Sequence, residues 1–162
     1  MFPVNIFVIC KTQMAKSITR RTLLGFRNAK CNMHAFDDLI NQIKNNQKEL
    51  IERINKGQVF KRFKDMKFNA IVGNPPYQMA DGGSGTGISA LPLYDKFIEQ
   101  ALKLNPRYLT MIIPARWYAG GRGLNDFRNR MLNNAHLKYL VDYPKSRDCF
   151  EGVDIAGGVC YF

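Results

Sequence analysis

The residues with the clearest chemical potential in this chain form the run Asn74-Pro75-Pro76-Tyr77, which follows an apolar stretch ending at Gly73. Two consecutive prolines fix φ and remove two backbone donors, and Pro75 favours an extended conformation at Asn74. We therefore expect a stiff strand exit that presents the Asn74 side-chain oxygen beside a bare carbonyl, with an aromatic ring just beyond. Two acceptors and a ring suit a planar group that carries an NH2. A rigid turn without chemistry is the alternative that four residues leave open.

Bulk composition bounds the class of protein. The 162 residues, 46% apolar and 23% charged, suit one globular domain. No apolar run approaches the ~20 residues of a membrane-spanning helix, and the apolar start lacks the marks of a signal peptide. The four cysteines form no C-x-x-C pair and the two histidines stand apart. The sequence thus predicts no membrane span, no metal site, no disulfide framework and a cytoplasmic setting.

The net charge of +11 is distributed unevenly along the chain. Residues 1–68 hold 14 Lys and Arg against 5 Asp and Glu, whereas residues 69–162 hold 10 against 8. A basic half favours a polyanionic partner such as nucleic acid. A solvated helix face is the alternative interpretation of the same charges.

Periodicity predicts strands that alternate with helices, and such alternation is typical of parallel βαβ units in an open α/β sheet. A glycine-rich loop is expected at residues 81–87, and a helix is expected to begin at Pro92. Asp37 and Asp38 are cap-type residues in front of another helix. The predicted strands are 4–10, 31–36, 68–73, 108–113, 137–143 and 155–162, and the predicted helices are 12–24, 39–57, 92–105 and one around 124–132.

Several short motifs follow one another in a specific order. They are Gly73-Asn74-Pro75-Pro76-Tyr77-Gln78, the glycine-rich loop, residues 92–97, residues 112–117 with Gly120-Gly121 and Phe127-Arg128, and Asp148-Cys149-Phe150 followed by Gly157-Gly158-Val159. Together they resemble the catalytic domain of adenine-N6 DNA methyltransferases, most closely the Eco57I-like branch of restriction–modification enzymes. The resemblance implies a Rossmann-like fold that uses S-adenosylmethionine, with an open, mostly parallel sheet and helices on both faces.

The resemblance also implies roles for residues around the target base. Asn74 and the Pro75 carbonyl would hold the amino group of an adenine flipped out of double-stranded DNA, within a catalytic run that includes Pro76 and Tyr77. Tyr77 would stack on one face of the base and Phe150 would clamp the other, with plain core packing as the alternative for Phe150. Four arginines are further candidates, either for phosphate contacts or for solvated surface: Arg116, Arg122, Arg128 and Arg130.

For the cofactor, residues 33–39 look like the motif in which an acidic residue holds the adenine amine. Asp37 is the candidate and Asp38 its neighbour, with helix capping as a compatible role. Leu93 or Phe97 would line the adenine pocket of the cofactor, although their helical spacing favours core packing. Metal is not implied.

Two departures from the family pattern bear on activity. The strand at 4–10 ends in Ile9, Cys10 and Lys11, where the family usually has an acidic residue. Motif I, a strand and glycine-rich turn expected between the strands that end near Cys10 and Gly73, is not found in these residues, nor is a target-recognition region. The expectation is a single partial catalytic domain, with 1–68 as its basic part and 69–162 as its target-base part.

The first functional hypothesis is a site-specific DNA adenine-N6 methyltransferase domain from a restriction–modification system. A second is an inactive fragment, or a nucleic-acid-binding subunit that needs a complementary chain to supply motif I and target recognition. A protein glutamine N-methyltransferase is a less favoured third, because it would grip an amide in the same way but fits the glycine-rich loop poorly.

Overall fold

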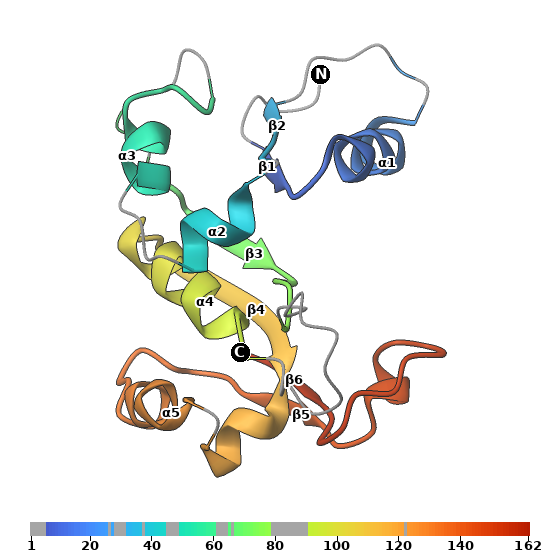
Figure 1. Ribbon diagram of the computed structural model, residues 1–162, viewed down its shortest axis with the longest axis vertical. Helices are drawn as coiled ribbons and strands as arrows, with labels where there is room; N and C mark the ends of the chain where they lie inside the picture. Colours follow the sequence, from blue (N-terminus) through green and yellow to red (C-terminus); the bar gives the residue numbers. More distant parts are fainter. Residues whose placement is uncertain are drawn as a thin grey trace. The chain divides into compact units, whose positions relative to one another are not determined.

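Figure 1 shows a computed structural model of the chain, which describes residues 6–25, 27, 32–36, 38–44, 49–60, 65, 67–78, 91–121 and 123–162. The chain divides into two compact units, unit 1 (Met1–Lys67) and unit 2 (Phe68–Phe162). The boundary falls beside the point where the basic excess of the sequence ends.

Unit 1 contains a parallel pair of short strands, β1 (Phe7–Cys10) and β2 (Asn32–Ala35). Between them in sequence runs helix α1 (Gln13–Leu24). The helix begins after Thr12, whose Oγ1 accepts a hydrogen bond from the Ala15 amide at 3.0 Å, and it ends at Gly25 with φ 59°. A side-chain acceptor is a typical signal for the start of a helix, and a glycine with positive φ is a typical signal for its end. The predicted helix over 12–24 is confirmed.

The rest of unit 1 contains two short helices, and residues 36–60 carry most of the buried apolar side chains of its described part. Helices α2 (Leu39–Lys44) and α3 (Glu49–Asn55) correspond to the one helix expected over 39–57, and residues 45–48 between them lie outside the described part. The apolar side chains of Met14 and Ile18 in α1 are 73% and 59% exposed. The buried apolar residues of the described part are Cys10, Leu24, Phe36, Leu39, Ile43, Leu50, Ile54, Val59 and Phe60.

Unit 2 contains a four-stranded sheet in the order β3-β4-β6-β5. Strands β3 and β4 are parallel, whereas β6 is antiparallel to both of its neighbours. The sheet is mixed because β5 and β6 are joined by a loop without a crossover helix, and parallel neighbours need such a crossover. The strands are β3 (Ala70–Gly73), β4 (Tyr108–Pro114), β5 (Val141–Tyr143) and β6 (Val159–Tyr161).

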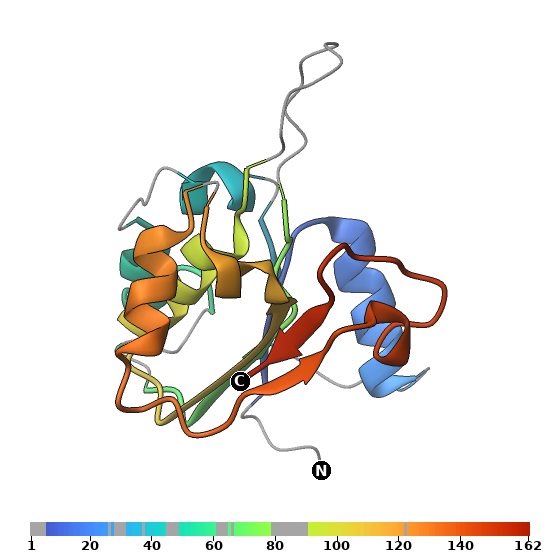
Figure 2. The same ribbon diagram turned by 90° about the horizontal axis from the view of Figure 1, so that it is seen from below.

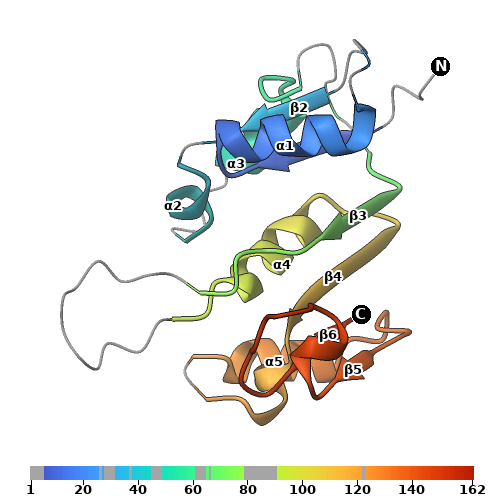
Figure 3. The same cartoon turned by 90° about the vertical axis from the view of Figure 1, so that its right-hand side faces the viewer.

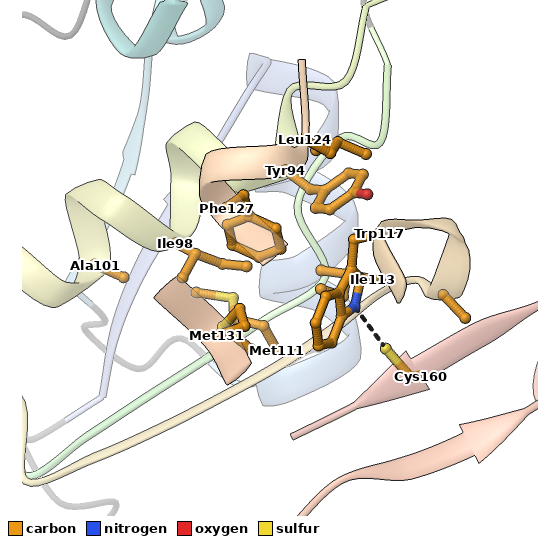
Figure 4. Packing of buried hydrophobic residues seen from close by; sticks show 11 residues of the cluster. Tyr94, Ile98, Ala101, Met111, Ile113, Trp117, Leu124, Phe127, Met131 and Cys160 are labelled. Carbon is orange, nitrogen blue, oxygen red and sulfur yellow. Dashed lines mark hydrogen bonds between the residues drawn. The ribbon is translucent and has the colours of Figure 1, made fainter. Parts of the chain in front are cut away.

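Helices α4 (Tyr94–Lys103) and α5 (Asn125–Leu132) lie on the same side of this sheet (Figure 2). Figure 4 shows the buried cluster that they form with β4, β6 and the 3-10 helix η1 (Ala115–Ala119). Trp117 is fully buried at its centre, and its Nε1 donates a hydrogen bond to the Cys160 sulfur at 3.4 Å. The sole tryptophan of the chain therefore anchors the packing of unit 2.

The opposite face of the same sheet is more open. Val72, Tyr108 and Tyr161 are 76%, 61% and 38% exposed. Within unit 2 the described helices α4 and α5 therefore cover one face, and the expected helices on the second face stay a prediction.

One helix start differs from expectation. Pro92 precedes α4 and forms an isolated antiparallel bridge with Gln78 instead of opening the helix. Tyr94 is the first helical residue, because Pro92 is held in extended pairing with a distant segment, a contact that the local sequence does not reveal. In the described part of the chain, no helix has the length and apolar character that crossing a membrane requires.

Candidate active site

Three segments of unit 2 leave the sheet at a common edge. Parallel pairing puts the ends of β3 and β4 at this edge, where Gly73 lies opposite Met111 and the longer β4 continues to Pro114. Val159, the first residue of β6, pairs with both Pro114 and Tyr143, and Figure 3 shows β6 and β5 side by side. Residues 74–77, η1 and the β5–β6 loop (residues 144–158) therefore meet at the carboxyl ends of β3, β4 and β5, where α/β sheets bind ligands.

The run 74–77 presents acceptors that the protein itself does not use. Asn74 is exposed and Pro75 is buried. No residue of the described ranges donates a hydrogen bond to the Asn74 side chain or to the Pro75 carbonyl. The far end of the run is fixed, because the Leu93 amide donates to the Tyr77 carbonyl at 3.1 Å. Two free acceptors thus lie on a backbone that is held at both ends.

Tyr77 ends the run and is half-buried. Its hydroxyl oxygen is buried and has no partner among the described residues. Burial, with smaller contributions from Cys149 and Cys160, raises the pKa of Tyr77 to about 12. The hydroxyl therefore stays protonated at physiological pH and is not a base. Because Cys149 contributes to this shift, the β5–β6 loop that carries it lies within electrostatic range of Tyr77.

Phe150 follows Cys149 in that loop and is half-buried. Its amide donates to the Ser146 carbonyl at 2.8 Å, and its own carbonyl accepts from the Val153 amide at 3.1 Å. The structure thus brings Asn74, Tyr77 and the segment that carries Phe150 to one edge of unit 2, while their roles toward a base stay predictions.

The start of α4 holds a polar residue that sequence reasoning did not single out. Asp95 is 6% exposed, and its Oδ1 has no partner among the described residues. Burial raises the pKa of Asp95 above its usual value, although Lys96 at 3.5 Å opposes this shift. An acidic residue in the first turn of a helix is common on protein surfaces. Only its burial distinguishes Asp95 from such surface residues.

The predicted cofactor residues lie in different units. Asp38, in unit 1, is exposed, and its Oδ1 accepts from Asn41 Nδ2 at 2.6 Å in a cap-type contact. Leu93 is 1% exposed and is packed inside unit 2, whereas Phe97 is half-buried. Asp37 lies outside the described residues. The cofactor role of the four residues therefore stays a prediction.

The arginine candidates differ in their partners. Arg128 Nε donates to the Tyr118 carbonyl at 2.7 Å, and Arg130 pairs with Glu99. Arg116, half-buried in η1 at the common edge, forms no ion pair or hydrogen bond with the other described residues. Arg122 lies outside the described residues. Of the three described candidates, Arg116 is the one free to contact a ligand.

The family model described as Eco57I restriction-modification methylase matches residues 4–150. The chain belongs to this family. Membership confirms the resemblance found in the sequence motifs.

A relative of this Eco57I-family chain carries a more specific name. The uncharacterized adenine-specific methylase of Mycoplasma pneumoniae (strain ATCC 29342 / M129 / Subtype 1) is 39% identical over 98 residues. The match covers 60% of this chain and 23% of the relative, so the chain spans about a quarter of that protein's length. No solved structure matches the chain. Among the described residues, no group of three His, Cys, Asp or Glu is placed to hold a metal ion.

Proposed function

We propose that this chain supplies the target-base part of a DNA methyltransferase that transfers a methyl group from S-adenosylmethionine to N6 of a flipped adenine, within a restriction–modification system. The observation that carries the proposal is the pair of unused acceptors on Asn74 and Pro75 beside the ring of Tyr77. Family membership and the name of the M. pneumoniae relative favour methyl transfer to adenine.

The chemistry of the acceptors follows from the electronic structure of adenine. The lone pair of its exocyclic nitrogen is delocalised into the ring, which makes N6 a poor nucleophile. When the two N–H groups donate to Asn74 Oδ1 and to the Pro75 carbonyl, the nitrogen becomes more pyramidal and its lone pair more localised. Positive charge then develops on nitrogen during transfer, so both hydrogen bonds strengthen in the transition state and lower its free energy.

An adenine inside a duplex does not reach such a site, and flipping it out costs roughly a few kcal/mol. Tyr77 offers a neutral ring for stacking, since its raised pKa of about 12 keeps it uncharged. Phe150 would cover the second face of the base. Stacking on an aromatic ring contributes about 1–3 kcal/mol per base, which is enough to offset much of the cost of flipping.

The described candidate residues differ in how well they fit S-adenosylmethionine. Asp38 fits, because its carboxyl is exposed and one oxygen has no described partner to prevent it accepting from an adenine amine. Phe97 fits as a half-buried apolar wall, whereas Leu93, at 1% exposed, offers almost no surface. When bound, S-adenosylmethionine supplies the methyl group of its sulfonium. The part of Asn74 and Pro75 is to hold N6 toward that methyl group.

A complementary strand is part of the proposal. In the described residues β3 pairs with β4 alone and β1 with β2 alone, so each has one unpaired edge. Unpaired edges accept further strands. These edges support the proposal that a strand with a glycine-rich turn, on a longer form of this protein or on another chain, joins the sheet, and that target recognition also lies outside these residues.

Asn74→Ala tests the base site without a known recognition sequence or a cofactor. The probes are two labelled duplexes that differ at one base opposite an abasic site: adenine in one and purine, which lacks the NH2, in the other. Wild type should bind the adenine duplex about tenfold more tightly, the order expected for loss of one or two hydrogen bonds. Asn74→Ala should remove that difference, as measured by fluorescence anisotropy.

The matched control is Asn69→Ala, an exposed asparagine at the other end of β3, which should keep the full adenine preference. Equal binding of both duplexes by the wild type would contradict the proposed function. A DNA digest after incubation with S-adenosylmethionine, assayed for N6-methyladenine, then measures transfer itself.

A further inference from the structure

The β5–β6 loop carries Phe150 but has little apolar packing of its own. Most of its side chains are exposed, among them Arg147, Glu151 and Val153. A loop without a core is usually mobile unless hydrogen bonds fix it. Its conformation therefore depends on the few polar contacts that it makes.

Ser146 makes more of those contacts than any other residue of the loop. It is 2% exposed and is one of three polar or charged residues classed as buried in the described part of the chain. Its Oγ donates to the Val153 carbonyl at 2.9 Å and accepts from the Ile155 amide at 2.8 Å. Its carbonyl accepts from the amides of Cys149 and Phe150 at 3.1 and 2.8 Å. One buried side chain therefore ties both halves of the loop together around Phe150.

The two ends of the β5–β6 loop are also held close together. Gly158 has φ +75°, and a Cβ built on it would meet the Tyr143 carbonyl oxygen at 2.2 Å. Its own carbonyl accepts from the Ala115 amide at 3.1 Å, at the start of η1. The two ends of the loop thus lie against each other at the common edge, and the position of Phe150 is set by what lies between them.

We propose that Ser146 is a positioning residue for the target base, which acts by holding the β5–β6 loop in the conformation that directs Phe150 to the base beside Tyr77. The inference rests on the proposed function and extends it to a residue that touches neither base nor cofactor. Loss of the hydroxyl removes two buried hydrogen bonds and leaves the Val153 carbonyl and the Ile155 amide without partners. The loop then samples other conformations, and Phe150 covers the base less often.

Ser146→Ala tests the inference through the preference for an unpaired adenine over a fully paired duplex of the same sequence. The preference should fall about tenfold, as expected for two lost hydrogen bonds. The affinity for the paired duplex should not change, because phosphate contacts do not involve the loop hydroxyl. The Ile155 amide should exchange its hydrogen faster, since it loses its acceptor.

A double variant separates positioning from general destabilisation. If Ser146 acts through Phe150, the preference of Ser146→Ala/Phe150→Ala should equal that of Phe150→Ala alone. Additive losses would overturn the inference, and so would an unchanged preference in Ser146→Ala while Asn74→Ala still loses its discrimination of adenine. An unchanged preference in Ser146→Ala would overturn the inference but leave the proposed function intact. A wild type with no preference for unpaired adenine would contradict both the inference and the proposed function.

Arg147→Gln is the matched control, because it breaks the exposed Arg147–Asp154 ion pair of 3.1 Å in the same loop and should leave the preference unchanged. If Ser146→Ala does not fold, Ser146→Cys keeps the size of the side chain and weakens both hydrogen bonds. It should then show the same loss to a smaller degree, and an unchanged preference in it would overturn the inference.

Discussion

At the scale of single residues, the hydroxyl of Tyr77 affects stability, whereas its ring is proposed to bind the base. The hydroxyl is buried without a described partner, and a buried polar group in that state destabilises a fold. The ring is the part that the proposed stacking uses. Removing the oxygen alone should therefore improve stability and leave base binding intact.

We accordingly expect Tyr77→Phe to unfold at the same or a higher temperature than wild type and to keep the preference for unpaired adenine, whereas Tyr77→Ala should lose it. The pKa of Tyr77 is about 12 in the folded chain and 10.0 in its reference state. The stability of the wild type is thus independent of this ionisation below pH 10 and falls as pH rises from about 10 to about 12, because the folded state resists loss of the proton. The advantage of Tyr77→Phe in thermal melts should grow over that window, and a constant advantage would count against burial of the hydroxyl.

Arg116 differs from its neighbours in having no described protein partner, which leaves its guanidinium available for a phosphate. Arg116→Gln should lower affinity for any duplex and reduce the slope of log affinity against log salt by about one. Arg130→Gln, which breaks an existing pair with Glu99, should change the slope less. Equal slopes for wild type and Arg116→Gln would exclude the contact.

The sequence alone predicts the behaviour of a residue when that behaviour is set by its covalent neighbours. Two prolines stiffen the run 74–77 whatever surrounds it, so its free acceptors follow from the sequence. Ser146 and Asp95 could not be found in this way. Ser146 bonds residues seven and nine positions away, and Asp95 differs from a surface carboxylate only by its burial.

At the scale of elements, helix α1 shows how much stability local signals supply in unit 1. The Thr12 side chain satisfies one backbone donor at the start of the helix, and Gly25 closes its end. Met14 and Ile18 are exposed, so burial of this face does not add to the stability of the helix within unit 1.

Thr12→Ala should therefore destabilise α1 by about 1 kcal/mol and lower the midpoint of the helical circular-dichroism signal. Thr12→Ser, which retains a hydroxyl acceptor, should restore it. An unchanged midpoint in Thr12→Ala would mean that other contacts hold the start of the helix.

Features that depend on distant partners were harder to predict than features set within one segment. The strand at 108–113 and the helices at 12–24 and around 124–132 are confirmed, because apolar period and capping residues lie within each segment. The antiparallel direction of β6 and the shift of the start of α4 from Pro92 to Tyr94 depend on partners far along the chain. Such non-local contacts do not produce a periodic pattern of apolar residues in the sequence.

At the scale of the whole molecule, the two units have separate buried clusters among the described residues. The cluster around Trp117 is formed by unit 2 alone. Because Trp117 is the one tryptophan of the chain, its fluorescence reports on unit 2, whereas circular dichroism reports on both units. In Thr12→Ala the fluorescence midpoint should stay at the wild-type value while the dichroism midpoint falls.

The bridge between Gln78 and Pro92, with the Leu93–Tyr77 backbone bond beside it, has an evolutionary consequence. It joins the two ends of residues 79–90, so the position of Tyr77 does not depend on how many residues lie between them. Each doubling in the length of a closed loop adds only about 0.6 kcal/mol of entropy loss. Residues can therefore be gained or lost between Gln78 and Pro92 during evolution with little effect on the position of Tyr77.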